Sequence, residues 1–143
     1  MKKISITMAV LSIFVIAFFA LNSPVNKANS SGFVLIRLLD EDGRVVVDET
    51  YEFEEGMTLF NVLNDNLDIA CADRSYDIDY SCDYTSFNNH IILKIEDVET
   101  NWFGSYLQIF IGDEPSNYGI DSIEIVDGTV YTFKYVDLGG DGS

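Results

Sequence analysis

The groups that could do covalent chemistry are few in this chain of 143 residues. It has one histidine, His90, and two cysteines, Cys71 and Cys82. A Ser-His-Asp triad needs the histidine as its base, but His90 follows Asn88 and Asn89 and stands near no recognisable nucleophile motif. A Cys-His pair needs a free thiol, whereas an even pair of cysteines in an oxidising compartment predicts a disulfide. We therefore expect a protein that is not an enzyme.

Candidate oxygen ligands for a metal ion stand close together in one acidic segment. Asp77, Asp79 and Asp83 resemble the start of a calcium loop, in which side-chain oxygens bind a hard cation. The pattern then breaks, because Cys82 occupies the place of the turn glycine and Asn88 the place of the bidentate glutamate. Acidic loops of exported domains are usually just solvated. We predict no metal site, with an irregular calcium site at these aspartates as the minor alternative.

Aromatic side chains offer a better basis for binding than the ionisable ones do. They gather in the acidic segment and around the strand predicted over Ser105–Ile111. Aromatics in loops at one end of a rigid sheet can form a partly apolar ligand wall; the alternative is that they pack the loops onto the core. In the binding interpretation the aromatic side chains stack on the ligand, and Gln108 supplies an amide for hydrogen bonding. The predicted ligand-binding residues are Phe87, Trp102, Tyr106, Gln108 and Tyr118.

The charge distribution argues against several kinds of partner. All 24 acidic residues lie at or after Asp40, and beyond residue 30 only five lysines and arginines oppose them, which gives −19 for that part. Nucleic acid is not expected as a partner, because its phosphate backbone requires a basic face. Anionic membrane surfaces would be repelled for the same reason. The acidity favours solubility and basic partners without identifying a ligand.

The first thirty residues differ in kind from the rest. A positive start at Met1–Lys3 is followed by the apolar run Ile4–Leu21, which is the layout of a secretory signal peptide. Ala28-Asn29-Ser30 places small residues for a cut before Ser31. The alternative is a retained membrane anchor, because the apolar run is close to the length that spans a bilayer. Either way, the rest is predicted to be secreted or held at the extracellular face of the cell membrane.

Residues 31–137 are predicted to form one domain, followed by a flexible tail over 138–143 and preceded by the export segment, residues 1–30. The domain begins with a hairpin of 32–39 and 45–53 around a glycine turn. Thr58 is predicted to cap a short helix, whose apolar residues recur at three- and four-residue steps.

Beyond the helix, residues 72–89 are predicted to be irregular and stapled by the two cysteines. The further predicted strands cover 91–95, 105–111 and 130–136, and 122–126 is predicted to be a short extended piece. A hairpin, one helix and then several strands favour an α+β fold, in which the helix covers one face of a mixed sheet. The expected architecture is β-grasp-like, with the last strand beside the first, and it is preceded by the export helix.

Four segments, taken together, resemble a known family. They are the hairpin Phe33–Phe53, the segment Glu55–Leu63, the strand Ser105–Gly112, and the stretch from Tyr118-Gly119-Ile120-Asp121 through Asp127-Gly128 to Phe133-Lys134-Tyr135. Their order and spacing resemble the bacterial domain-of-unknown-function family related to the C-terminal domain of transcobalamin and intrinsic factor. The resemblance extends over residues 32–136.

This resemblance implies a β-grasp fold and noncatalytic capture of a small molecule at the cell surface, on its way to a transporter. A corrinoid such as cobalamin is the implied ligand, and no catalytic cofactor is expected. The chain departs from the family at Leu107, where members commonly have tryptophan, and at Gly112-Asp113, which replaces the usual turn pair. The alternative function is an extracellular protein-interaction or adhesion module that uses an exposed sheet edge.

Overall fold

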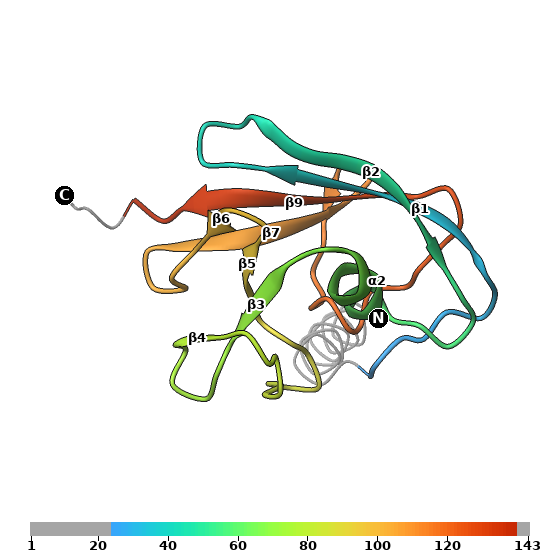
Figure 1. The fold of residues 1–143 in the computed structure, drawn as a ribbon, viewed down its shortest axis with the longest axis horizontal. Coiled ribbons are helices and arrows are strands. Elements are labelled where there is room, and N and C mark those ends of the chain that lie inside the picture. Colours follow the sequence, from blue (N-terminus) through green and yellow to red (C-terminus); the bar gives the residue numbers. More distant parts are fainter. Residues whose placement is uncertain (1–23, 140–143) are drawn as a thin grey trace, which may run out of the picture.

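Two β-sheets and one helix make up residues 24–139, the part of the chain that the computed structural model describes. The larger sheet has the strand order β2-β1-β9-β7-β8, and the smaller has the order β4-β3-β5-β6. Figure 1 shows the larger sheet across the top of the view, with helix α2 and then strands β3 and β4 below it. The predicted α+β class is therefore confirmed. The apolar part of the predicted export segment lies outside the described residues.

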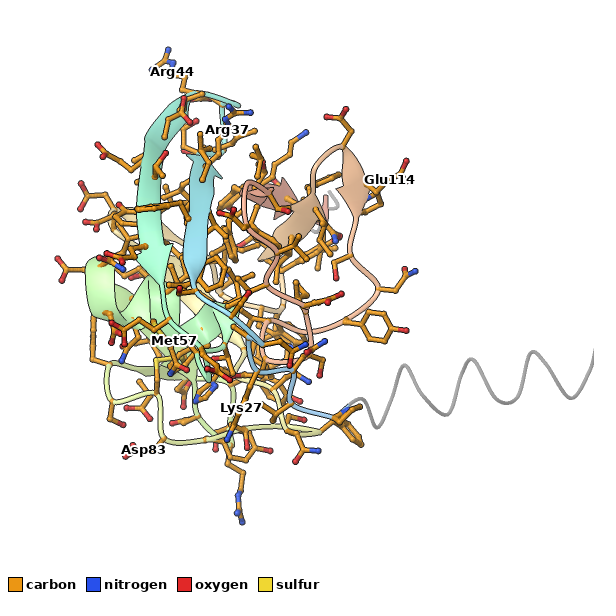
Figure 2. The ribbon with its side chains drawn as sticks, turned by 90° about the vertical axis from the view of Figure 1, so that its right-hand side faces the viewer. Lys27, Arg37, Arg44, Met57, Asp83 and Glu114 are labelled. Carbon is orange, nitrogen blue, oxygen red and sulfur yellow. A yellow bond between two sulfur atoms is a disulfide. The ribbon has the colours of Figure 1, made fainter. Side chains whose placement is uncertain are left out.

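The helix α2 spans Leu59–Asn66. The larger sheet consists of β1 Gly32–Leu39, β2 Val45–Phe53, β7 Ser105–Ile111, β8 Glu114–Pro115 and β9 Val130–Asp137. The smaller sheet consists of β3 Ile69–Ala72, β4 Ile78–Asp79, β5 Ile92–Ile95 and β6 Val98–Glu99. Figure 2 gives the orientation of the domain: Arg37 and Arg44 mark the end with the β1–β2 turn, and Lys27 and Asp83 lie at the opposite end. Within residues 24–139 no helix is long and apolar enough to cross a membrane.

Strand β1 lies inside the larger sheet, between β2 and β9, and its side chains alternate between a buried and a more open face. Val34, Ile36 and Leu38 are at most 1% exposed and face the core, whereas Phe33 on the other face is 55% exposed. On one side β1 pairs antiparallel with β2, which confirms the predicted hairpin. On the other side it pairs parallel with β9. The last strand thus lies beside the first, as the β-grasp prediction requires.

The helix begins where the sequence predicts, at the Thr58 cap. The Thr58 hydroxyl accepts a hydrogen bond from the backbone N–H of Asn61 at 3.2 Å, and the Asn61 side chain accepts one from the Thr58 N–H at 2.8 Å. Two N–H groups that the first helical turn leaves free are satisfied in this way. Leu59 and Leu63 are fully buried in the common core, so the apolar face of the helix holds it against the sheets.

The structure adds a second sheet to what the sequence predicts. Ile69–Ala72 is buried throughout and pairs with both β4 and β5. The segment 122–126, predicted to be a short extended piece, forms no ladder. There the hydroxyl of Tyr131 accepts from the Val126 N–H at 3.0 Å and donates to the Glu124 carbonyl at 2.7 Å. A buried side chain therefore satisfies backbone groups that a neighbouring strand would otherwise pair.

Candidate ligand cavity

The disulfide predicted between Cys71 and Cys82 is confirmed. Cys71 belongs to β3 and is fully buried, and Cys82 lies in the acidic segment with 6% exposure. The bridge ties that segment to the smaller sheet with a Cα–Cα distance of 5.0 Å. Neither sulfur is therefore a thiol nucleophile or a thiolate ligand while the bridge is intact.

A cavity of about 210 Å³ lies between β7 and the segment that leads into β5. Strand β7 contributes Tyr106 and Gln108, the connection before β7 contributes Trp102, and the connection after β8 contributes Tyr118. Four of the five residues predicted as ligand contacts thus line one cavity. Apolar side chains complete much of the wall: Ile92, Leu107, Ile109, Ile120 and Phe133.

The polar and aromatic groups of this cavity differ in how far they are engaged with other side chains. Trp102 is 38% exposed and stacks on Tyr76, with the ring centroids 5.4 Å apart. Tyr118 is 46% exposed. The hydroxyl of Tyr106 donates to the side-chain oxygen of Gln108 at 3.3 Å, and the amide nitrogen of Gln108 donates to the Ile109 carbonyl at 3.3 Å. Both contacts are long, so a ligand could replace them at small cost.

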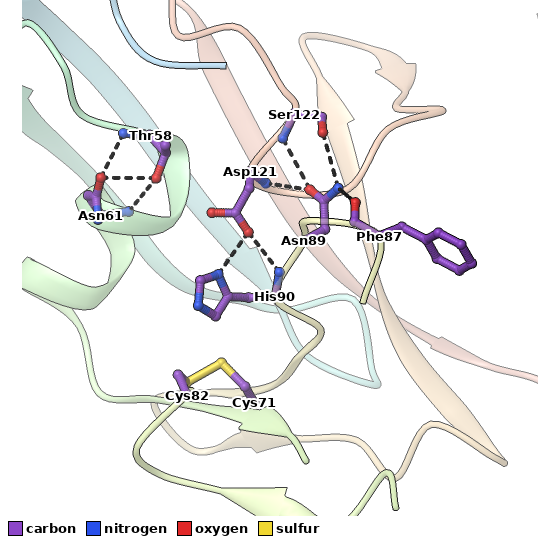
Figure 3. A network of polar contacts seen from close by, with 9 residues as sticks. All are labelled: Thr58, Asn61, Cys71, Cys82, Phe87, Asn89, His90, Asp121 and Ser122. Atoms are coloured by element: carbon purple, nitrogen blue, oxygen red, sulfur yellow. Dashed lines mark hydrogen bonds and ion pairs between the residues drawn. A yellow bond between two sulfur atoms is a disulfide. The ribbon is translucent and has the colours of Figure 1, made fainter. Parts of the chain in front are cut away.

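Phe87, the fifth predicted contact, stands apart from the cavity lining. It occupies a tight turn with Asn88, and both have positive φ, 52° and 68°. The backbone of Ser86 and that of Asn89 exchange hydrogen bonds across this turn, at 2.8 and 3.0 Å. Phe87 is 63% exposed at its tip, and Figure 3 shows its ring pointing away from the neighbouring polar network.

His90 has a structural partner that sequence reasoning missed. One carboxylate oxygen of Asp121 accepts from the His90 backbone N–H at 2.7 Å and contacts the imidazole Nδ1 at 2.8 Å (Figure 3). The ring also stacks on Phe60, with centroids 3.6 Å apart and planes 2° from parallel. Because 31 residues separate His90 from Asp121, only the tertiary fold brings them together.

Asn89 ties the same two segments a second time. Its side-chain oxygen accepts from the backbone N–H groups of Asp121 at 2.7 Å and Ser122 at 3.1 Å. Its side-chain nitrogen donates to the Phe87 carbonyl and the Ser122 hydroxyl, both at 3.1 Å. Gly119 lets this contact form, since a Cβ there would lie 2.5 Å from the Asn89 Cγ. Asn89, His90 and Gly119 all line the cavity, so this network fixes one of its walls.

Two of the three aspartates of the minor calcium alternative, Asp77 and Asp79, make hydrogen bonds within their own segment. The carboxylate of Asp79 accepts from the hydroxyl of Ser81 at 2.7 Å and from its N–H at 2.9 Å, which holds the pKa of Asp79 below its ordinary value. The backbone of Asp77 exchanges hydrogen bonds with Asp73. Among the described residues, no group of three or more His, Cys, Asp or Glu side chains is arranged to hold a metal ion.

Comparison with known proteins finds no matching family model and no matching curated protein. Solved structures do share the fold. One is a "putative metal binding protein" from Ruminococcus gnavus ATCC 29149, with a TM-score of 0.50 and 16% identity; the match covers 74% of this chain and 97% of that one.

The other is haptocorrin in complex with Cbi, with a TM-score of 0.54 and 15% identity. That match covers 76% of this chain and 26% of haptocorrin, so the chain spans about a quarter of that protein. At these identities the likeness establishes a related fold. The transcobalamin-like architecture implied by the sequence resemblance is supported at that level.

Proposed function

We propose that this protein is a noncatalytic binding module that captures a small molecule outside the cytoplasm, with the ligand held at the cavity beside β7. The observation that carries the proposal is the convergence of Trp102, Tyr106 and Tyr118 with the Gln108 amide on that one cavity. An apolar wall with a few placed polar groups is the usual composition of a ligand site.

The size of the cavity defines how a ligand would bind. About 210 Å³ is less than the 300–1,000 Å³ or so of sites that enclose a drug-sized molecule. A larger ligand would therefore insert one edge and lay its remaining surface over the exposed faces of Trp102 and Tyr118, which are 38% and 46% exposed. A broad, flat molecule suits such a site better than a compact one.

A corrinoid is the ligand that we propose first. It is broad, its ring methyl groups offer apolar surface that can pack on aromatic rings, and its peripheral amides could exchange hydrogen bonds with Gln108. The fold likeness to haptocorrin, which was solved with Cbi, supports this choice. We also propose membership of the transcobalamin-related family on the four sequence segments and this likeness.

Export and the lack of catalysis belong to the same proposal. The disulfide between Cys71 and Cys82 supports an oxidising location, and the signal-like start of the chain supports export. The same disulfide leaves neither cysteine with a free thiol that could act as a nucleophile. His90 is engaged by Asp121 at Nδ1 and by Phe60 across its ring face, which supports a role in holding the cavity wall.

Equilibrium dialysis of the purified exported protein against cobalamin, and separately against cobinamide, tests the proposal. We expect saturable binding that weakens at least tenfold in Tyr106→Ala. Tyr80→Ala is the matched control, because Tyr80 is a 66% exposed aromatic outside the cavity lining that contacts the Lys94 ammonium. Absence of saturable binding to either compound would contradict the corrinoid proposal, and equal losses in both variants would contradict the site.

A further inference from the structure

Residues 26–30 precede the first strand, yet they are built into the domain. The N–H of Ala28 donates to the Met57 carbonyl at 2.8 Å, and the Ala28 carbonyl accepts from the Gly56 N–H at 2.9 Å. Ala28 is 5% exposed and belongs to the common hydrophobic core. We call residues 26–30 the strap.

The strap makes a third backbone contact, at the cavity wall. The N–H of Asn26 donates to the backbone carbonyl of Asp121 at 2.7 Å. The carboxylate of the same Asp121 holds His90. Pro24 and Asn26 also share a second hollow, of about 400 Å³, with Tyr118, which lines the ligand cavity as well. The strap therefore contacts the loop that contains Asp121, and Asp121 in turn holds His90 at the cavity wall.

Losing the strap would disturb the domain in two ways. It would uncover core surface now covered by Ala28, and it would leave the partner groups on Gly56, Met57 and Asp121 without their strap contacts. Backbone groups that lose a partner in a partly buried place are costly. A cut before Ser31, which the small residues at 28–30 favour, would have both effects.

We propose that the strap is an integral part of the folded domain and that proteolytic removal of the leader, when it occurs, takes place before Asn26. This moves the processing point and the start of the domain upstream of Ser31. The proposal stands on the strap contacts and is independent of which ligand the cavity binds.

The test is the N-terminus of the exported protein. The full chain, expressed with its own leader and a C-terminal tag in a bacterial host, is recovered from outside the cytoplasm, and its N-terminus is read by intact-mass and peptide mass spectrometry. We expect the recovered protein to begin at Asn26 or upstream, an uncut Met1 included. A start at Ser31, or anywhere after Asn26, overturns the proposal.

Two charge-matched variants then test the strap as part of the fold. Ala28→Asp places a carboxylate at a 5% exposed core position, whereas Asn29→Asp adds the same charge at the exposed neighbour. We expect the first to lower Tm by at least about 5 °C or to abolish recovery of folded protein, and the second to leave Tm within about 2 °C. Equal Tm values for both variants and the unmodified chain overturn the proposal.

Discussion

One oxygen of the Asp121 carboxylate serves both the backbone N–H of His90 at 2.7 Å and its imidazole Nδ1 at 2.8 Å. The Asp121 side chain is 6% exposed and that of His90 is 17% exposed. The contact joins the segment entering β5 to the loop before β9, which are distant in the sequence. The imidazole is therefore held at Nδ1 by Asp121 and on a ring face by Phe60.

Replacing this carboxylate should destabilise the domain. In Asp121→Asn the amide oxygen can still accept, but without the charge that strengthens both contacts. We expect a loss of about 1–3 kcal/mol in the free energy of unfolding, measured by urea denaturation at pH 7. Asp113→Asn, at an exposed turn position, is the control and should change stability by less than about 0.5 kcal/mol. Equal effects would mean that the Asp121 contact is energetically unimportant.

Replacing Gly119 by alanine should destabilise the domain. Its added Cβ would meet the Asn89 side chain at 2.5 Å, and Asn89 is held there by its own hydrogen bonds. We expect Gly119→Ala to cost about 1–3 kcal/mol in urea denaturation. Gly104→Ala is the matched control, because there the nearest atom to a new Cβ is 3.4 Å away. If Gly119→Ala were as stable as the control, the Asn89 side chain could move away from the new methyl group without loss of stability, and the prediction would be wrong.

The disulfide should contribute measurably to stability. It closes a short loop, with 11 residues of sequence separation, and the chain-entropy estimate for such a loop is about 3 kcal/mol. The Cys71→Ala/Cys82→Ala double variant should lose about that much in thermal or urea unfolding. Reduction of the unmodified protein should produce a similar loss, and reduction of the double variant should produce none. A reductant effect on the double variant would point to another cause.

Tyr131 should make the domain sensitive to alkali. Burial raises the pKa of its phenol above the ordinary value of about 10. The folded state keeps this proton at a pH where the unfolded chain has lost it. The contribution of Tyr131 to the free energy of unfolding is thus fully present below pH 10, and it declines as the pH rises above 10.

We therefore expect Tyr131→Phe to lose about 1 kcal/mol at pH 7, through its missing contacts to Val126 and Glu124. Its further loss between pH 9 and 11 should be smaller than that of the unmodified protein. Some alkaline loss should remain, because burial and two glutamates also raise the pKa of Tyr51. Urea denaturation across this pH range provides the measurement. Identical pH profiles would contradict the role assigned to Tyr131.

The parts of the fold that could be predicted are those with local signals. The β1–β2 hairpin follows from alternation around Gly43, whose φ is 79°, and the helix follows from the Thr58 cap. Strand β3 carries no such signal, because Ile69–Ala72 is buried on every residue and so shows no alternation. The segment 122–126, predicted to be a short extended piece, joins no sheet, and Tyr131 occupies backbone groups there that a partner strand would use.

The candidate site was predictable in its aromatic part only. Tyr106 and Gln108 belong to one predicted strand and Trp102 and Tyr118 lie on either side of it, so their convergence on one cavity follows from the local order of elements. Phe87 was grouped with them by residue type, but its turn directs it elsewhere. The cavity wall that contains Asn89 and His90 is held by contacts to Asp121, more than 30 positions away. A single sequence contains no pattern that predicts such contacts.

The central claim, that the cavity beside β7 binds a small molecule, is tested most directly through Trp102, the single tryptophan of the chain. Its fluorescence intensity, corrected for absorption by the coloured ligand, can be followed while cobinamide is added to the exported protein. A ligand that stacks on the indole should quench the corrected emission along a saturable curve, and Tyr106→Ala should shift the midpoint at least tenfold to higher concentration. A corrected emission that stays constant up to millimolar cobinamide would contradict corrinoid binding at this cavity.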